Sequence, residues 1–539
     1  ASYDRLKAFL ESSGPRLIAQ NGQFDLRWLS TRGIEARLDF DTMLAAHLLD
    51  ENSSVGLKSL ASSMWGVPDY KPNTEEWEWK VPEYQDLLYY VGLDAFYTAR
   101  AYAVQRLQLL GDKKLARFFA KVMVPAAKAI SKVEQRGIYL DSVRLEERQH
   151  QTLEKRTAIE SELNQITGRM INWASPQQVG QVLFNDLKLP VTENNKTGPS
   201  TREGVLVRLK QHHELPGRLI ELRETYKYDS TYFRPWAEFA AYDSRIHFHY
   251  NLAGTVTGRG SSRAHQTPRN PFVRSILGAP PGKKLIKADM AQEELRIAAA
   301  LSGEPTMLRE FLEGIDPHLE TAHVLTGLPR DQIDLETRKK AKAINFGFLY
   351  GMGWKNFQRY AIEKYQVYFS EQESKEARTK FFTHWPKIAD WHEQVKRIVR
   401  KQKCIRYLDG RIRHLPGITS SNQGDRAEAE RQGVNSPVQG FGSDLLLLAL
   451  VELEGYVEDG RALDTEECFT VGWSHDELLF EVDEDVADYW AGVIKEVMEH
   501  PKLMDVLGIQ LKVPLLAEVK VAQYWAEPEV KSETPKMPL

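Results

Sequence analysis

Residues 469–482, FTVGWSHDELLFEV, predict a β-hairpin that carries two neighbouring carboxylates. Apolar residues alternate with other residues on both sides of the short polar break at residues 474–477, and a period of two is typical of strands. Asp476 and Glu477 repel each other at the tip, and burial favours neither charge unless a positive charge lies beside them. A divalent cation would supply that charge. On the hairpin alone, a solvated turn that happens to carry Asp-Glu is the alternative.

Composition sets the class of protein. The chain has 539 residues, 42% of them hydrophobic and 27% charged, which is typical of a globular protein with more than one domain. A net charge of −4 excludes a uniformly basic coat but allows a local basic groove. Cys404 and Cys468 are too few for a disulfide framework or a zinc site, which favours a reducing compartment. The apolar run at residues 445–451 is far shorter than the roughly 18 residues of a membrane span, and the N-terminal residues show no signal-peptide pattern.

A second candidate carboxylate follows a short apolar stretch. Residues 285–288 predict a buried strand, Asp289 ends it, and the sequence DMAQEELR at residues 289–296 then begins a helix. A strand end fixes a carboxylate while the following loop leaves it accessible, so this position suits a metal ligand. A helix N-cap is the alternative for Asp289.

A third motif, RKKAKAINFGFLYG at residues 338–351, combines basic and aromatic residues on one helical face. Arg338, Lys342, Phe346 and Tyr350 are spaced four apart and therefore form a single stripe. The stripe is cationic at its N-terminal end and aromatic at its C-terminal end, which matches the phosphates and the base of a nucleotide. A core helix with a solvated basic start explains the intervening lysines, but explains the shared face less well.

These three motifs, in this order, resemble motifs A, B and C of family A DNA polymerases. Other segments are similar to further motifs of that family, and together the likeness runs from about residue 120 to residue 527. The additional segments are TGR at 257–259, DPH at 316–318, YLDGR at 407–411 and ERQGVNSPVQG at 430–440. Motif A departs from the usual D-Y-S-Q-I-E-L-R at Met290, Ala291 and Glu293, which puts the fine selectivity of the nucleotide pocket in question.

The resemblance implies a mixed α/β chain with the right-hand palm, fingers and thumb of a polymerase, preceded by a partial ribonuclease-H-like exonuclease domain. The expected boundaries are 1–112 for the exonuclease-like domain, 113–529 for the polymerase (thumb about 140–250, palm about 251–304 and 431–529, fingers about 305–430) and 530–539 for a disordered tail.

The resemblance also implies the chemistry. A primer 3′-hydroxyl attacks the α-phosphorus of a dNTP, with two Mg²⁺ ions, which Mn²⁺ can replace, held by Asp289 and Asp476. Glu477 is the auxiliary carboxylate, Arg338 and Lys342 meet the triphosphate, and Lys342 is also the candidate proton donor to pyrophosphate. We therefore expect a monomer that binds primer–template DNA and dNTPs, acts in DNA replication or repair, and works in the cytoplasm of a bacterial or phage-infected cell.

Further positions match residues that hold the substrates. Glu294 would close the space of a ribose 2′-hydroxyl, Phe346 would pack under the sugar and disfavour dideoxynucleotides, and Tyr350 would lie near the templating base. The other expected dNTP contacts are Gln292 and His318, and the expected DNA contacts are Arg259, Arg269, Arg431, Asn435, Gln439 and His475.

The N-terminal part resembles the proofreading 3′–5′ exonuclease of the same polymerases. Residues 21–25, NGQFD, are similar to its second motif, which ends in Asp25, and residues 90–94, YVGLD, are similar to its third, with Tyr90 and Asp94. A first motif of the form D-x-E is missing from the sequence. We therefore expect a remnant with little or no nuclease activity.

Three other functions compete with a DNA polymerase. A single-subunit RNA polymerase shares the palm, but Glu294 and the exonuclease-like segment argue against it. A catalytically dead DNA-binding scaffold would not need Asp289, Asp476 and the cationic stripe together, and a pure nuclease would need the first exonuclease motif.

Three segments carry secondary expectations. Residues 375–413 are predicted to be helical and basic, and residues 67–82 a loop rich in Pro and Trp. GAPPGKK at residues 278–284 is one residue short of a phosphate-binding loop, and we interpret it as a plain turn.

Overall fold

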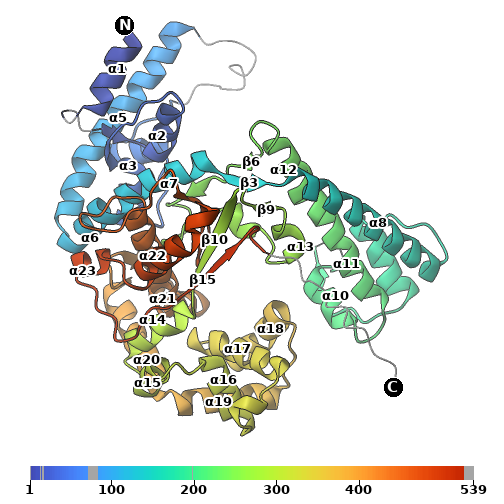
Figure 1. Cartoon of the computed structure of the whole chain (residues 1–539). Helices are drawn as coiled ribbons and strands as arrows, with labels where there is room; N and C mark the ends of the chain where they lie inside the picture. The colour runs from blue at the N-terminus through green and yellow to red at the C-terminus, as the bar shows by residue number, and fades with distance from the viewer. Residues whose placement is uncertain (1, 13, 15–16, 71–82, 197, 527–539) are drawn as a thin grey trace.

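The centre of the protein is a four-stranded antiparallel sheet (Figure 1). The structure, a computed structural model, describes residues 2–526 apart from residues 13, 15, 16, 71–82 and 197. The sheet has the order β13-β14-β10-β15, with strands β13 (Cys468–Ser474), β14 (Glu477–Asp483), β10 (Lys283–Met290) and β15 (Ala517–Ala522). Along β10 the side chains of Ile286, Ala288 and Met290 are buried, while Lys287 and Asp289 on the opposite face are only partly buried. One face of the sheet is therefore core, and the other presents polar groups.

The predicted hairpin is confirmed as β13 and β14. Register places Asp289 of β10 opposite Glu477 of β14, so the strand ends bring motifs A and C together. The strand that carries Asp289 begins at Lys283, two residues before the predicted one, because Lys283 and Lys284 extend the ladder and pair with Asp483 and Glu484. The turn at residues 280–282 precedes it, as expected for a segment that is not a phosphate loop.

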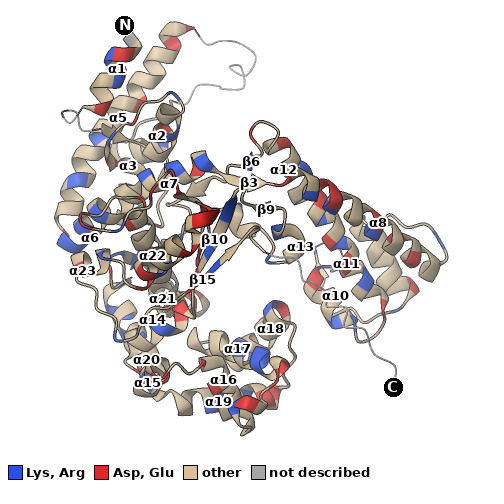
Figure 2. Cartoon of the chain, in the orientation of Figure 1, with Lys and Arg blue, Asp and Glu red and all other residues tan. Residues whose placement is uncertain are grey.

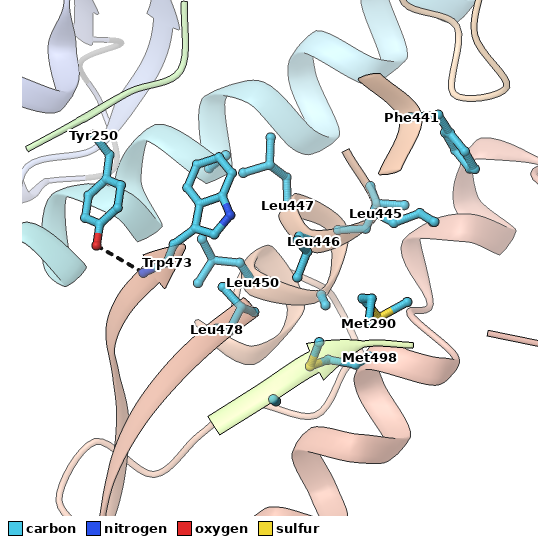
Figure 3. Packing of buried hydrophobic residues seen from close by; sticks show 14 of the residues in the cluster. Tyr250, Met290, Phe441, Leu445, Leu446, Leu447, Leu450, Trp473, Leu478 and Met498 are labelled. Carbon is cyan, nitrogen blue, oxygen red and sulfur yellow. Dashed lines mark hydrogen bonds between the residues drawn. The ribbon is translucent and has the colours of Figure 1, made fainter. Parts of the chain in front are cut away.

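Helices cover the core face of this sheet. The long helix α21 (Gln423–Leu453) and the helix α22 (Ala487–Glu499) place Leu446, Leu450 and Met498 against Met290 and Leu478 (Figure 3). By length and composition α21 is able to cross a membrane, yet 89% of its most apolar stretch is buried inside the protein, as in a core helix. The helices α7 (Val124–Arg136), α14 (Glu293–Ser302) and α23 (Leu503–Leu507) complete this region.

A helical arm with its own hydrophobic core projects to one side of the sheet (Figure 1). Within this arm, helix α11 (Leu215–Lys227) has Pro216 in its first turn, a position that proline favours because its missing N–H would have no partner inside the helix there. Its helices are α8 (Ser142–Thr167), α9 (Pro176–Gly180), α10 (Glu203–Leu209), α11 (Leu215–Lys227) and α12 (Arg234–Phe239), with π-helical segments at Gln181–Asp186 and Tyr228–Phe233 and the short strands β4 (Asn194–Asn195) and β5 (Gly198–Pro199). This arm lies within the predicted thumb.

A second group of helices lies below the central sheet in the view of Figure 1. Asp316 and Asp334 cap α16 and α17 by accepting backbone N–H bonds, and Ser370 with Glu373 forms a capping box on α19. The helices are α15 (Pro305–Leu312), α16 (Pro317–Thr326), α17 (Leu335–Leu349), α18 (Trp354–Tyr365), α19 (Glu371–His384) and α20 (Pro386–Gln402). They fall within the predicted fingers, whereas α21 runs across the predicted boundary between fingers and palm.

The N-terminal unit packs against α7, and α1 with the first half of α5 projects away from the central sheet (Figure 1). Its two strands form a parallel pair, as expected for a small α/β unit. The elements are α1 (Ser2–Glu11), β1 (Leu17–Ala19), α2 (Gly22–Ser30), β2 (Leu38–Asp41), α3 (Thr42–Leu49), α4 (Leu57–Trp65), α5 (Tyr84–Leu110) and α6 (Lys113–Phe118), followed by a π-helical segment at Phe119–Met123.

The remaining short elements join these units. They are β3 (Ile138–Leu140), β6 (Arg245–Ile246), β7 (Tyr250–Asn251), β8 (Ser261–Ser262), α13 (Pro271–Arg274), β9 (Leu277–Gly278), β11 (Cys404–Arg406) and β12 (Ile412–His414), with single 3₁₀ turns at Ala264–Gln266, Arg330–Gln332, Pro416–Thr419 and Glu484–Val486.

The prediction of a continuous helical segment at residues 375–413 is wrong at its end. α20 stops at Gln402, and β11 and β12 form an antiparallel hairpin closed by Gly410, whose φ of 106° is a conformation that favours glycine. Residues 71–82 of the predicted loop and the predicted tail at 530–539 lie outside the described residues.

Candidate polymerase active site

The hairpin and β10 bring Asp289 and Asp476 to one site. The backbone N–H of Met290, which follows Asp289, donates to the carbonyl of Asp476 at 3.0 Å, so the two motifs are tied through the main chain. The site is a cavity of about 230 Å³, and the side chains that line it are those of Arg269, Arg274, Lys287, Asp289, Ser474, Asp476, Glu477 and Ala526. This position, at the polar face of the sheet, is the one that the sequence predicted for a metal centre.

The neighbouring carboxylates Asp289, Asp476 and Glu477 repel one another, and this repulsion favours a cation between them. Burial and the negative charges of Asp476 and Glu477 raise the pKa of Asp289 to about 7. In addition, Oδ1 of Asp476 is buried without a hydrogen-bond partner among the described residues. Repelling carboxylates, one of them with a buried oxygen that accepts no hydrogen bond from the described residues, fit the oxygen-ligand chemistry of Mg²⁺ or Mn²⁺.

Glu477 differs from its two neighbours because its oxygens are already occupied. Arg274 lies 3.2 Å from Oε1 and Lys287 lies 3.0 Å from Oε2, and the indole N–H of Trp525 donates to Oε1 at 2.6 Å. Glu477 therefore neutralises two cations beneath the site. Arg269 is exposed and approaches Asp476 at 3.5 Å, which places it beside the carboxylates.

A residue with left-handed backbone lies within three positions of each candidate metal-binding carboxylate. His475, immediately before Asp476, has φ 58°, and Gln292, three residues after Asp289, has φ 54°. Such a conformation is uncommon for a residue other than glycine and costs free energy that the surrounding structure must offset. Both turns therefore depend on contacts that hold them.

The predicted stripe lies on α17, with its basic residues shown in blue in Figure 2. Lys342 and Phe346 are partly exposed, and Arg338 donates to Asp316 Oδ2 from Nε at 3.0 Å and from Nη2 at 2.7 Å. His318 is buried against this helix and lies 5.8 Å from the ring of Phe346, centre to centre. Burial, together with the charges of nearby lysine and arginine, lowers the pKa of His318 to about 4, so the imidazole is neutral at pH 7.

Glu294 and the end of α17 are joined directly. The hydroxyl of Tyr350 donates to the Glu294 carboxylate, and the same hydroxyl hydrogen-bonds with Gln439 of α21. Burial raises the pKa of Glu294, and the bond from Tyr350 opposes that rise. Three motifs that are far apart in sequence therefore meet at the Tyr350 hydroxyl.

The predicted DNA contacts on α21 share one face. Arg431, Asn435 and Gln439 are four residues apart and partly exposed, while Val434 and Val438 between them are buried. The guanidinium of Arg431 bonds to the neighbouring Glu428, and Oδ1 of Asn435 has no protein partner among the described residues. Arg259 is partly buried and His475 is exposed at the hairpin turn.

In the exonuclease-like motifs, unlike at the Asp289–Asp476 site, a lysine binds one of the candidate metal-binding carboxylates directly. Nζ of Lys58 lies 2.5 and 2.7 Å from the two oxygens of Asp94 and 2.9 Å from the hydroxyl of Tyr90, and the hydroxyl of Tyr70 donates to Asp94 at 2.9 Å. Burial and the charge of Asp41 raise the pKa of Asp25 to about 6. A lysine ammonium thus occupies the carboxylate of the third motif.

Comparison with protein families matches residues 142–527 to DNA polymerase family A and residues 2–109 to a 3′-5′ exonuclease. The chain belongs to DNA polymerase family A. The first match covers the arm, the central sheet and the helices α14–α22, so it includes all the polymerase motifs predicted from sequence. The second confirms an exonuclease-like domain at the N-terminus.

Individual relatives agree with this family A assignment. The chain is 30% identical to DNA polymerase I of Rhizobium leguminosarum over 97% of its length, and 31% identical to the thermostable DNA polymerase I of Thermus aquaticus over 90%. It spans only 52% and 55% of those two proteins. A solved structure, the POL domain of Pol1 from M. smegmatis in complex with DNA primer-template and dNTP, matches with a TM-score of 0.83 and 26% identity over 97% of this chain and 88% of that one.

This member of DNA polymerase family A also has a buried carboxylic acid, Glu293, that the sequence marked only as a departure in motif A. Glu293 is 7% exposed and packs beside Gly442 of α21, where a Cβ would lie 2.7 Å from its Oε2. Burial, with the charges of Asp476 and Glu294, raises its pKa well above the usual value. Burial of Glu293 therefore favours its uncharged form, in contrast to a carboxylate that solvent can reach.

Sequence reasoning missed the cations that pair with Glu477. The sequence does contain a signal for Lys287, because this residue lies two positions before Asp289 on β10 and its side chain therefore points to the same face of the sheet. Arg274 is the last residue of the short helix α13, and Trp525 lies near the C-terminal end of the described residues; no local pattern in the sequence marks either of them.

Proposed function

We propose that this chain is a DNA-directed DNA polymerase that adds dNTPs to a primer 3′-end on a DNA template, in replication or repair. The observation that carries the proposal is the convergence of Asp289 and Asp476 at the polar end of the sheet. The solved relative from M. smegmatis, whose complex holds primer-template and dNTP, supports it. We place the enzyme in the bacterial cytoplasm or in a phage-infected cell, acting as a monomer.

Asp289 and Asp476 would hold the divalent ions, two Mg²⁺ in our proposal. When bound, these ions would neutralise the carboxylates, polarise the reacting phosphate and promote ionisation of the primer hydroxyl. The contribution of the chain is to fix both carboxylates from separate strands and to keep Glu477 paired with Arg274 and Lys287. Because those cations satisfy Glu477, we assign it an auxiliary role beneath the site.

The triphosphate would lie along α17. Lys342 is partly exposed on the same face as Phe346 and would neutralise phosphate oxygens, then donate its Nζ proton to the leaving pyrophosphate. Arg338 would exchange its bond with Asp316 for a phosphate contact. Neutral His318, bonded to the Asn345 amide at 3.0 Å, would position the segment around the phosphates rather than supply charge.

Selection of deoxynucleotides would come from Glu294. Tyr350 holds the Glu294 carboxylate, which limits its freedom to move aside for a 2′-hydroxyl. Phe346 is partly exposed one turn before Tyr350 and would form the floor beneath the sugar. Gln292 would contribute through its backbone at the turn before α14, because its left-handed conformation directs the start of that helix.

We further propose that the exonuclease-like domain has little or no nuclease activity in this chain. The support is Lys58, whose ammonium binds both oxygens of Asp94 and the Tyr90 hydroxyl. The Lys58 ammonium, 2.5 Å from an oxygen of Asp94, neutralises this carboxylate and competes with a metal ion for it. Asp25 and Asp94 would then share no ion.

The test is extension of a labelled primer on a DNA template with Mg²⁺ and either dNTPs or rNTPs. We expect extension with dNTPs only, and no shortening of the primer when nucleotides are omitted. Extension with rNTPs at an equal rate would contradict the role of Glu294. Primer shortening that Asp25→Asn abolishes would contradict the inactive exonuclease, and absence of any extension by folded, DNA-bound protein would contradict the polymerase assignment.

A further inference from the structure

Hydrogen bonds to two backbone carbonyls hold the turn that presents Asp476. His475 adopts φ 58°, an unfavourable conformation for a residue with a side chain. The indole N–H of Trp473 donates to the carbonyl of His475 at 2.9 Å. On the other side, the N–H of Met290 donates to the carbonyl of Asp476 at 3.0 Å. The two peptide groups that flank the Asp476 Cα are therefore both fixed, one of them by a side chain.

The indole ring of Trp473 is itself confined. Trp473 is 1% exposed and stacks on Tyr250 with ring centroids 6.0 Å apart and planes within 15° (Figure 3). The ring of His265 packs edge-on against it at 5.4 Å. A Cβ at Gly260 would lie 2.2 Å from the far edge of the indole, so this glycine provides the space that the ring fills. A ring enclosed on these sides keeps its N–H aimed at the His475 carbonyl.

Tyr250 connects this ring to the N-terminal domain. Its hydroxyl accepts the backbone N–H of Trp473 at 3.0 Å, the bond drawn in Figure 3. Its carbonyl accepts from Nε2 of Gln23 at 2.7 Å, and its backbone N–H donates to the buried carboxylate of Glu134 at 2.7 Å. Gln23 also donates to Glu134 at 2.7 Å. Gln23 lies in α2, inside the segment that resembles the second exonuclease motif.

We propose that Trp473 is a positioning residue for Asp476, which fixes the left-handed turn at His475, and that Gln23 of the exonuclease-like domain braces it through Tyr250. The domain would then serve the polymerase site as a structural support. This inference rests on the proposed polymerase function for its kinetic consequences, but its structural consequence, a fixed turn, is measurable in the protein without metal, DNA or nucleotide.

The first experiment replaces Trp473 by Phe, which keeps a ring in place and removes the N–H. Trp490→Phe is the matched control, because Trp490 is also buried in the palm and its indole donates at 3.1 Å to Glu467, away from the turn. We expect amide hydrogen exchange at residues 474–477 to become about five- to tenfold faster in Trp473→Phe, the effect of losing one hydrogen bond of about 1 kcal/mol. The control should leave exchange at these residues unchanged.

Kinetics then separate positioning from general packing. At saturating dNTP we expect Trp473→Phe to lower kcat by about 10- to 100-fold, since a small misplacement of a reacting group has effects of that size. The KM for dNTP should change less than about twofold, because the contacts to the nucleotide are intact. Equal exchange and equal kcat in Trp473→Phe and Trp490→Phe would overturn the proposal. If wild type fails to extend primers, the proposed function is wrong, and the exchange experiment still decides the role of the turn.

A comparison of Gln23→Ala with Ser30→Ala tests whether the hydrogen bond from Gln23 to Tyr250 supports the turn. Ser30 also joins α2 to α7, at 3.1 Å from Gln135, but contacts neither Tyr250 nor Trp473. We expect Gln23→Ala to speed exchange at residues 474–477 and to lower kcat by about three- to tenfold, the effect of one lost hydrogen bond acting through a second residue. The same small effect in both variants would show that α2 supports the fold without reaching the turn.

Discussion

Replacing Asp289 by Asn should stabilise the metal-free protein at alkaline pH, although it removes a residue that we assign to catalysis. The pKa of Asp289 rises from 3.8 to about 7, mainly through burial and then through Asp476 and Glu477. One pKa unit corresponds to about 1.36 kcal/mol, so ionising this group costs the folded chain about 4 kcal/mol. Asparagine has nearly the same shape and no charge, and therefore removes that cost.

The dependence on pH follows from the direction of this change. Between about pH 4 and pH 7 the folded chain retains a proton on Asp289 that the unfolded chain has released. The free energy of unfolding therefore falls as the pH rises through this window, and is level above it. The stability gap between Asp289→Asn and wild type should widen by about 2–3 kcal/mol from pH 5 to pH 8.

The assay is thermal unfolding with EDTA at several pH values, followed by a titration with Mg²⁺ at pH 8. Asp483→Asn is the matched control, since Asp483 lies at the other end of the same β10–β14 ladder and pairs with Lys283 near solvent. Mg²⁺ should raise the unfolding temperature of wild type more than that of Asp289→Asn, because the carboxylate that favours the ion is absent from the variant. Equal unfolding temperatures of wild type and Asp289→Asn at every pH would refute the account of the site as a set of repelling carboxylates.

Three further predictions test other parts of the structure. Glu294→Ala should raise the ratio of rNTP to dNTP incorporation by about tenfold or more, measured by single-nucleotide extension. An unchanged ratio would show that Glu294 does not select against the ribose 2′-hydroxyl. Lys342→Ala should lower kcat/KM for dNTP by about 10²-fold with DNA affinity within about threefold of wild type; a change in DNA affinity alone would contradict its place on the triphosphate. Asp444→Asn, which breaks a fully buried pair with Arg411 at 2.7 Å, should destabilise the protein by about 3–5 kcal/mol in thermal unfolding, and an unchanged midpoint would be inconsistent with that pair.

Local pattern was sufficient for the elements that carry the chemistry. The hairpin followed from alternation around residues 474–477, and the α17 stripe followed from the spacing of Arg338, Lys342, Phe346 and Tyr350. Both signals lie within a few turns or strands, where periodicity reflects which face is buried. That the motifs meet at one site came from the family resemblance, which the match to DNA polymerase family A confirms.

Contacts between distant segments were not predictable from local pattern. The hairpin at Cys404–His414 was mistaken for helix because a basic, mixed sequence gives no clear period, and its Arg413 is fixed instead by Glu51 of the N-terminal domain at 2.6 Å. The pairing of Lys58 with Asp94 depends on packing between α4 and α5. The enclosure of Trp473 by Gly260 likewise joins residues more than 200 positions apart.

In our proposal, Asp476 and Asp289 together form the centre that joins a dNTP to the primer. The most direct measurement is single-turnover extension of a primer by wild type, Asp476→Asn and Asp483→Asn, with DNA binding followed in parallel by fluorescence anisotropy. We predict that Asp476→Asn extends the primer at least about 10²–10³-fold more slowly while binding DNA normally, and that Asp483→Asn behaves as wild type. Extension by Asp476→Asn within about tenfold of wild type would contradict this role of Asp476.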